Sequence, residues 1–575
     1  ETNDEDAQIA GYTLAVTGDN NKAKAVAKDA TANFDITNTY SKDFGRLKLT
    51  KATSPAGLTP ANTVFTLTYP DGTTTKDVKY SEFAADGTYT FDNLPTGRYT
   101  VTESVDSAKV DGYVLVVSGG NGEAQLVEKD ETADVKITNT YTQTSVDFSK
   151  VDVGGTEIGG AVISILDTNG NVVKDSNGKA ITWESRENES HTVTGLKADT
   201  TYRMHEVTAP SGYSVVTDVE FTIAKDGTVS TTNSANYVNN KVTMTDTATS
   251  VTFSKQDLGG NEIKGALIQI LDKDGKLAKD GSDSEVFWTS EDGKSHVVTG
   301  LAAGDYTMHE DTAPAGYKTT KDIKFTINTD GTVSAGSGND TATSEVSGTK
   351  VTMKDDVTSV TFSKQDLGSG KEIGGAQIEI RDENGVVVKD KDNNEVKWTS
   401  EAGKSHTVTG ITAGTYTMHE VVAPNGYTVT TDIKFTIDKN GKVSGDSNND
   451  SKTSEVSETK VIMKDDVTSV SFSKTDLGGT EIGGAKIQIL ASNGKVASDK
   501  DNNKLEWTSE ADKTKVITGL AAGTYTMHED TAPDGYNKAT DITFTIGTDG
   551  KVTSDALKND VVTMTDTLTA FDVTV

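Results

Sequence analysis

The sequence has no cysteine among its 575 residues, so disulfide bonds and thiolate metal sites are excluded. Hydrophobic residues make up only 33% and aromatic residues 6%, which predicts thin cores. No stretch approaches the roughly 18 consecutive apolar residues that cross a bilayer, so we expect no membrane insertion in this segment. Positive charge is also scarce. The formal net charge of −32 disfavours binding to nucleic acid or to an anionic membrane and favours solubility.

Three short motifs organise what is present. Val-Thr-Phe-Ser-Lys ends at Lys255, Tyr-Thr-Met-His-Glu ends at Glu310, and Val-Thr-Met-Lys-Asp ends at Asp355. Because side chains alternate along a β-strand, each motif places its last, ionisable residue on the same face as its apolar residues. A lone buried charge costs several kcal/mol, so we expect the lysine, the glutamate and the aspartate to meet inside one domain.

This set recurs along the chain. The lysines at 150, 255, 364 and 474 are spaced by 105, 109 and 110 residues, which is a domain-sized period. The sets are Lys150/Glu206/Asp246, Lys255/Glu310/Asp355, Lys364/Glu420/Asp465 and Lys474/Glu529/Asp566, with the variant Lys51/Glu103/Asn139 upstream.

Short alternating runs such as 266–270 and 323–327 are typical of strands. Asp-Gly and Asn-Gly pairs such as Asp274-Gly275 predict hairpin turns in which both residues accept positive φ. No convincing amphipathic helix of ten residues is present. The sequence therefore predicts an all-β protein of tandem immunoglobulin-like sandwiches joined by short linkers.

The motifs Phe-Ser-Lys-x-Asp, Tyr-Thr-Met-His-Glu-x-x-Ala-Pro-x-Gly-Tyr and Val-x-Met-x-Asp resemble those of the B-type domains of Gram-positive collagen adhesins and of SpaA-like pilin stalks. The resemblance covers nearly the whole chain. It implies reverse-immunoglobulin (Cna B-type) domains in an elongated array. In that family a lysine of the first strand condenses with an aspartate or asparagine of the last strand, and a glutamate assists.

The resemblance implies a definite set of reacting residues, with no cofactor and no metal. The implied isopeptide cross-links are Lys51–Asn139, Lys150–Asp246, Lys255–Asp355, Lys364–Asp465 and Lys474–Asp566, and the assisting acids are Glu103, Glu206, Glu310, Glu420 and Glu529. The alternative is a buried salt-bridge triad in which no isopeptide bond forms. Condensation needs a neutral lysine and a protonated carboxyl, and an apolar pocket favours both. In the set with Asn139, Lys48 is an alternative to Lys51 as the reacting lysine. Lys48 is an odd number of residues from Lys51, so the alternation of the strand places its side chain on the outer face.

The expected domains are as follows: 1–40, the C-terminal part of a truncated pilin-like isopeptide domain; 41–143, a complete pilin-like domain (the first domain); 144–248, 249–357, 358–467 and 468–568, four Cna B-type repeats (repeats 1 to 4); and 569–575, the first strand of a following domain. No signal peptide or C-terminal sorting signal is recognisable, so we expect a segment of a longer protein.

Three recurring features each allow a structural and a functional interpretation. The histidines fall on the opposite strand face from the glutamates and lack metalloprotease spacing, so we expect His205, His309, His419 and His528 at the surface. Asp-rich turns resemble calcium loops, but hairpin turns are favoured because the glycine comes too early. One tryptophan per repeat, at 183, 288, 398 and 507, indicates core packing more than a carbohydrate platform.

The predicted function is mechanical: the stalk of a cell-wall-anchored Gram-positive surface adhesin. It would be extracellular, linked to peptidoglycan through a C-terminal anchor outside this sequence, and would present a distal region that binds a host matrix or cell-surface protein. Bond formation happens once, so the protein is not a turnover enzyme. The alternatives are a sortase-polymerised pilus shaft subunit, although a Tyr-Pro-Lys-Asn motif is absent, and a host-matrix-binding module.

Overall fold

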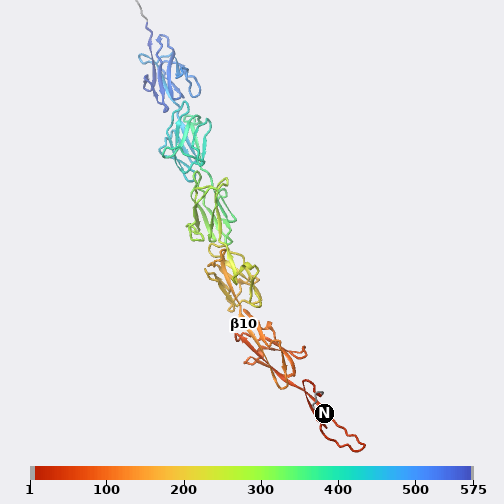
Figure 1. Cartoon of the computed structure of the whole chain (residues 1–575). Coiled ribbons are helices and arrows are strands. Elements are labelled where there is room, and N and C mark those ends of the chain that lie inside the picture. The colour runs from red at the N-terminus through yellow and green to blue at the C-terminus, as the bar shows by residue number, and fades with distance from the viewer. Residues whose placement is uncertain (1–6, 571–575) are drawn as a thin grey trace, which may run out of the picture. The chain divides into compact units, whose positions relative to one another are not determined.

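The structure, a computed structural model, describes residues 7–570, and nearly all its regular elements are strands. The predicted strand over 569–575 lies, from residue 571 on, outside the described residues. The chain divides into two compact parts, 1–249 and 250–575. Each sandwich keeps to a continuous range of colour in Figure 1 because it is built from a continuous stretch of sequence. The predicted all-β class and tandem sandwiches are confirmed.

Repeat 2 illustrates the two-sheet architecture. One sheet has the order β23 (His296–Thr299), β20 (Ser250–Asp257), β28 (Lys350–Asp355) and β27 (Ser344–Ser347). The other has the order β22 (Phe287–Thr289), β21 (Leu267–Asp272), β24 (Gly304–Thr312), β25 (Ile323–Ile327) and β26 (Val333–Ala335). The first sheet therefore carries the first and last strands of the repeat, and the second carries the middle of its sequence.

The other three repeats share this plan. Repeat 1 has the sheets β14 (His191–Thr194), β11 (Ser145–Asp152), β19 (Lys241–Asp246), β18 (Tyr237–Val238) and β13 (Thr182–Glu184), β12 (Val162–Leu166), β15 (Thr200–Thr208), β16 (Val219–Ile223), β17 (Val229–Thr231). Repeat 3 has β32 (His406–Thr409), β29 (Ser359–Asp366), β37 (Lys460–Asp465), β36 (Ser454–Ser457) and β31 (Lys397–Thr399), β30 (Gln377–Arg381), β33 (Gly414–Val422), β34 (Ile433–Ile437), β35 (Val443–Gly445). In repeat 4 the first sheet has the order β41 (Lys515–Thr518), β38 (Ser469–Asp476), β47 (Val561–Leu568) and β43 (Tyr536–Asn537), and β46 (Leu557–Lys558) also pairs with β47. The second sheet has the order β40 (Glu506–Thr508), β39 (Lys486–Ala491), β42 (Gly523–Thr531), β44 (Ile542–Ile546) and β45 (Val552–Thr553).

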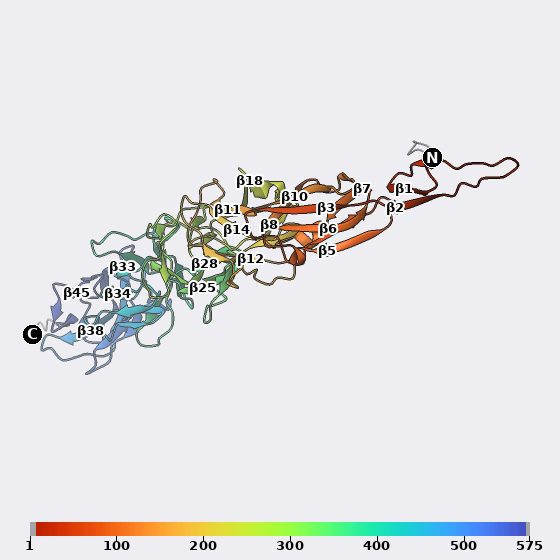
Figure 2. The same ribbon diagram turned by 90° about the horizontal axis from the view of Figure 1, so that it is seen from below.

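The first domain is a variant with two four-stranded sheets. They are β6 (Thr88–Pro95), β3 (Phe44–Ser54), β10 (Thr132–Gln143), β8 (Tyr113–Gly119) and β5 (Thr75–Lys79), β4 (Val64–Thr68), β7 (Gly97–Glu103), β9 (Ala124–Val127). The long strands β3 and β6 run side by side in Figure 2 and pair antiparallel. The described helical elements are single turns: α1 (Val105–Ala108), η2 (Tyr80–Glu82) and η3 (Ser234–Asn236). No helix within residues 7–570 is long and apolar enough to cross a membrane.

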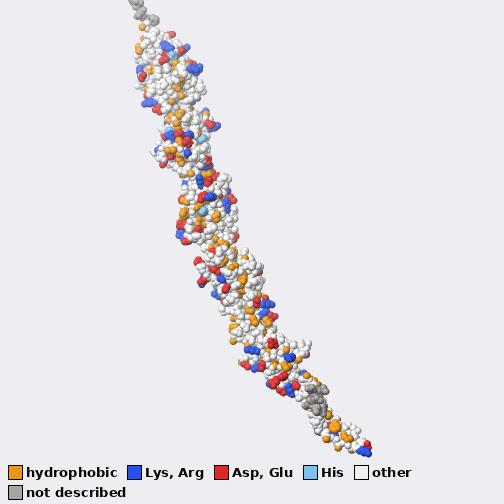
Figure 3. All heavy atoms as spheres, in the orientation of Figure 1, with side chains coloured by type: hydrophobic (Ala, Val, Ile, Leu, Met, Phe, Trp, Pro, Cys, Tyr) orange, Lys and Arg blue, Asp and Glu red, His pale blue; other side chains and the backbone are white. Residues whose placement is uncertain are grey.

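The first and last strands of each sandwich are parallel neighbours, as β20 and β28 are in repeat 2. The apolar residues of these strands, such as Val251, Phe253 and Met353, are fully buried against Ile268 and Phe325 of the opposite sheet. This inward row is the one that the alternation in the sequence predicts, and it ends in the ionisable residues described below. The polar faces are turned to solvent, and Figure 3 shows acidic and basic side chains interspersed over the face in view.

The predicted turns form, but only their glycines take positive φ. In the turn at Asp272, Gly275 has φ 76° and donates its N–H to the Asp272 carbonyl at 3.0 Å. Asp274 keeps negative φ because the Asp272 carboxylate accepts the N–H groups of Asp274 and Lys276, at 2.9 and 3.0 Å. The expectation of positive φ at both residues is therefore wrong. These turns are type I turns followed by a glycine bulge.

The N-terminal segment forms one antiparallel pair, β1 (Tyr12–Gly18) with β2 (Ile36–Lys42). None of its described residues before Phe44 is fully buried. A two-stranded ribbon that buries so little gains little stability from the hydrophobic effect.

Candidate functional site

Lys255 ends the inward row of β20 and is buried between the two sheets. Its side chain is 2% exposed, its Nζ lies 2.7 Å from Oε1 of Glu310, and it also contacts Oδ1 of Asp355. Lys255 and Asp355 belong to parallel strands of one sheet, while Glu310 reaches across the core from β24 of the other sheet. The three residues predicted from separate motifs are therefore brought together.

The strand register sets the offset between the lysine and the aspartate. Asp355 lies opposite Asp257, and Lys255 lies opposite Met353, so the reacting side chains are diagonal neighbours on one face. The lysine is long and the aspartate is short, and the diagonal lets Nζ reach the carboxyl. The same offset places Lys51 opposite Ile137 and two residues before the partner of Asn139.

The glutamate stands at an irregularity in its strand. Ile268 pairs with Glu310 but the preceding residue, Leu267, pairs with Thr312, so Asp311 is an extra residue in β24. Bulges of this kind re-aim neighbouring side chains and are frequent next to functional sites. The N–H of Thr320 donates to Oε2 of Glu310 at 2.7 Å, which leaves Oε1 toward the lysine.

All four repeats build the same triad, meaning the set of one lysine, one glutamate and one aspartate. The lysine Nζ lies 2.8, 2.7, 2.7 and 2.9 Å from the glutamate Oε1 in repeats 1 to 4, and the glutamate and aspartate side chains are 0% exposed. In each, the same Nζ contacts the aspartate Oδ1. The members are Lys150/Glu206/Asp246, Lys255/Glu310/Asp355, Lys364/Glu420/Asp465 and Lys474/Glu529/Asp566.

In each triad one carboxyl has a raised pKa, chiefly because it is buried. Burial raises the pKa of Asp246 to about 6 and that of Asp465 to about 8, and the neighbouring glutamate adds to both shifts. Burial also raises the pKa of Asp566 and, in repeat 2, raises the pKa of Glu310 to about 7. The outer aspartate oxygen, Oδ2, has no hydrogen-bond partner in any of the four triads. A proton shared between the two carboxyls would satisfy that oxygen.

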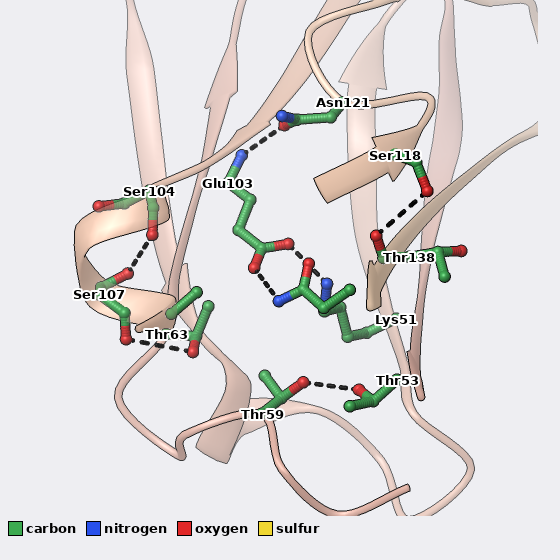
Figure 4. A network of polar contacts seen from close by, with 12 residues as sticks. Lys51, Thr53, Thr59, Thr63, Glu103, Ser104, Ser107, Ser118, Asn121 and Thr138 are labelled. Carbon is green, nitrogen blue, oxygen red and sulfur yellow. Dashed lines mark hydrogen bonds and ion pairs between the residues drawn. The ribbon is translucent and has the colours of Figure 1, made fainter. Parts of the chain in front are cut away.

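The first domain has a related arrangement in which Glu103 lies between the lysine and an amide acceptor (Figure 4). Lys51 Nζ lies 2.6 Å from Glu103 Oε2, and Asn139 donates its Nδ2–H to Glu103 Oε1 at 2.5 Å. Tyr141 accepts a second, longer bond of 3.3 Å from Nδ2 and donates its own hydroxyl to the Ala108 carbonyl. Burial lowers the pKa of Lys51, which favours its neutral, nucleophilic form. Lys48 is half-buried and lies on the other face of β3.

A second glutamate that the sequence analysis missed holds the lysine strand. In repeat 2, Glu262 accepts the Ser254 hydroxyl on Oε1 and the Lys255 backbone N–H on Oε2, the latter at 3.0 Å. Glu157, Glu372 and Glu481 do the same in the other repeats. The available signal was a glutamate seven or eight residues after each Ser-Lys pair. These glutamates fix the backbone from which the lysine projects.

The lysine is buried but not sealed from solvent. A cleft of about 500 Å³ in repeat 1 is lined by Trp183, His191 and Met204 and reaches Phe148 and Lys150. Corresponding clefts reach Lys364 and Lys474. Small molecules such as water therefore have a short route between the triad and the surface.

The recurring histidines lie at the surface and the recurring tryptophans pack against the core, as the sequence predicts. His309 is 35% exposed and lies 2.7 Å from Asp322, and the other three predicted histidines form the same pair at the surface. Trp288 packs on Phe253 and stacks on His296 with 4.3 Å between ring centres. Within residues 7–570, no group of three or more His, Cys, Asp or Glu is arranged to hold a metal ion.

Comparison with known families agrees with the repeated sandwich. The fold and its four copies define a modular protein built from repeated β-sandwich domains. The chain belongs to the SpaA family, described as a prealbumin-like fold domain, whose model matches residues 144–236, 249–341, 358–451 and 468–560. A domain family of unknown function, DUF5979, matches residues 47–142. No curated protein matches the chain.

Several solved structures are similar to this chain. The Bacillus anthracis TIE protein is 17% identical over 74% of this chain and 75% of its own, with a TM-score of 0.30. The pilus adhesin SpaC from Lactobacillus rhamnosus GG is 16% identical over 72% of this chain and 56% of its own, with a TM-score of 0.27. BcpA, the major pilin subunit of Bacillus cereus, is 16% identical over 56% of this chain and 99% of its own, with a TM-score of 0.23.

Proposed function

We propose that this chain is part of the stalk of a Gram-positive surface adhesin, and that each of its five complete domains is locked by an intramolecular isopeptide bond. The observation that carries the proposal is the buried triad. In the four repeats the lysine of the first strand contacts the aspartate of the last strand, and in the first domain Glu103 contacts both Lys51 and Asn139. In all five domains a glutamate from the opposite sheet contacts the lysine. A purely structural ion pair would need neither the second carboxyl nor the raised carboxyl pKa.

The bond follows from proton movements within one triad. In repeat 2, Lys255 transfers a proton to the carboxyl pair and becomes a neutral amine. The Nζ lone pair then attacks Cγ of Asp355, and the carbonyl π electrons move to Oδ1. Glu310 takes a proton from Nζ and delivers a proton to Oδ2, which leaves as water when the electron pair on Oδ1 re-forms the carbonyl. The products are an amide and one water, so neither an oxidant nor a cofactor is consumed.

In the first domain the leaving group is ammonia. Asn139 directs its Nδ2, the atom that must leave, at Glu103, and Glu103 also contacts Lys51. One glutamate therefore touches both the proton donor and the proton acceptor of the condensation. This arrangement supports Lys51–Asn139 as the fifth cross-link.

The position of the bonds explains what they would do under tension. Lys255 and Asp355 are 100 residues apart in sequence and occupy neighbouring parallel strands. Force entering at the start of β20 would pass through the bond to the end of β28, and the residues between them would bear no load. An extended chain spans about 3.4 Å per residue, so each bond would withhold about 30 nm of extension. A cell-surface position, an anchor to peptidoglycan and a distal host-binding region belong to the same proposal.

Intact mass spectrometry tests the bonds directly. Four losses of water and one of ammonia should make the purified chain about 89 Da lighter than its sequence. A mass equal to that of the sequence would refute the covalent part of the proposal. The stalk role is tested by pulling single chains and by measuring binding of single repeats to collagen, fibronectin and fibrinogen. We expect no unfolding steps from the five domains and no binding by the repeats, and tight binding by one repeat would favour a ligand-binding module.

A further inference from the structure

The residue ten positions after each assisting glutamate takes part in every triad through its backbone. Its N–H donates to the glutamate Oε2 at 3.0, 2.7, 3.0 and 2.7 Å in repeats 1 to 4. The residues are Val216, Thr320, Thr430 and Ala539. The backbone contact is therefore shared, while the side chain at this position is threonine in repeats 2 and 3, valine in repeat 1 and alanine in repeat 4.

In repeat 2 the side chain at this position touches the acceptor. The Thr320 hydroxyl lies 2.6 Å from Oδ1 of Asp355 and 2.8 Å from the Lys354 carbonyl, and the residue is 9% exposed. A hydroxyl has a single hydrogen, so it donates to one of these oxygens at a time. Val216 and Ala539 have no hydroxyl to offer in repeats 1 and 4.

We propose that Thr320 is an additional catalytic residue of repeat 2, whose hydroxyl stabilises the negative charge that develops on Oδ1 of Asp355 during amide formation. This inference deepens the proposed function and rests on it. Oδ1 carries at most half a negative charge in the carboxylate and a full charge in the tetrahedral intermediate. A donor held against it therefore binds the transition state more strongly than the starting state.

The surroundings of Asp355 support this role. The charged groups that face it are Lys255 and Glu310, so Thr320 is the neutral donor against Oδ1.

The test compares rates within one polypeptide. The full chain is made by cell-free synthesis, samples are denatured at intervals, and the cross-linked peptides from each repeat are quantified by mass spectrometry after digestion. In Thr320→Val, the Lys255–Asp355 bond should form about a hundredfold to a thousandfold more slowly, as for loss of one oxyanion donor. The other cross-links of the same chain are internal controls and should keep their rates. Thr320→Ser, which retains the hydroxyl, should restore most of the rate.

Equal rates in Thr320→Val and the unaltered chain, or a Thr320→Ser rate as slow as that of Thr320→Val, would overturn the proposal. Should Thr320→Val prevent repeat 2 from folding, Val216→Thr decides the matter. It should accelerate the Lys150–Asp246 bond, and an unchanged rate counts against the proposal. Absence of every cross-link in the unaltered chain would refute the proposed function itself, which is a distinguishable result.

Discussion

Replacing Glu310 by alanine separates the assisting acid from the two residues that it joins. Lys255 and Asp355 remain on neighbouring strands of one sheet, but the group that carries protons between them is gone. We expect the Lys255–Asp355 bond not to form, while the other four cross-links form normally because each triad is enclosed in its own domain. Glu310→Gln, which keeps the size of the side chain but cannot carry a proton, should behave in the same way.

The loss of stability can be estimated from the length of the closed loop. By analogy with a disulfide, a cross-link closing about 100 residues stabilises a domain by about 4.7 kcal/mol. Unfolding of a domain of roughly 110 residues has an entropy near 0.23 kcal/mol/K, so the loss should lower the melting temperature of repeat 2 by about 20 °C. Repeat 2 should also become extensible by about 30 nm under load.

Three measurements check this expectation. The Glu310→Ala chain should be heavier by about 18 Da than a fully cross-linked chain with the same substitution, because one water is retained. Calorimetry should show one early transition, and single-chain pulling should show one unfolding step. Glu345→Ala is the matched control, because Glu345 lies in the same repeat but is 63% exposed, and it should change none of the three.

If Glu310→Ala formed the Lys255–Asp355 bond at the unaltered rate, Glu310 would be a packing residue. The roles assigned to Glu206, Glu420 and Glu529 would then fall with it, because their contacts are the same.

Two further predictions concern pH and the N-terminal segment. In Lys364→Met the cross-link of repeat 3 is lost, and Asp465 stays buried with a raised pKa. The Asp465 carboxyl then binds its proton more tightly in the folded state than in the unfolded state. The free energy of unfolding of repeat 3 should therefore be greatest below about pH 4 and fall as pH rises toward about 8. Hydrogen exchange of peptides from β29 and β37 at several pH values measures this, and faster exchange at pH 4 than at pH 8, after correction for intrinsic rates, would contradict it. Trypsin should cleave within residues 7–42 before it cleaves the five sandwiches, because these residues form one exposed strand pair. Digestion of the sandwiches while residues 7–42 remain intact would contradict this prediction.

Local patterns along the chain predict the fold class and the members of each triad. Alternation along Val-Thr-Phe-Ser-Lys placed Val251, Phe253 and Lys255 on one face, and the structure buries all three. Period-two patterning is a local property, so it is legible without knowing which strands pair. Repetition then supported the assignment, because the lysine, glutamate and aspartate motifs recur in the same order in four copies.

Tertiary structure decided what the local pattern could not contain. The two-residue diagonal between Lys255 and Asp355 depends on the register of parallel strands, and the aim of Glu310 depends on the bulge at Asp311. The contact between Thr320 and Asp355 joins a loop to a strand 35 residues away, and no periodicity marks it. Alternation fixes the face on which a side chain lies, but atomic distances across a core follow from register, bulges and loop paths, which are set only when the whole sandwich packs.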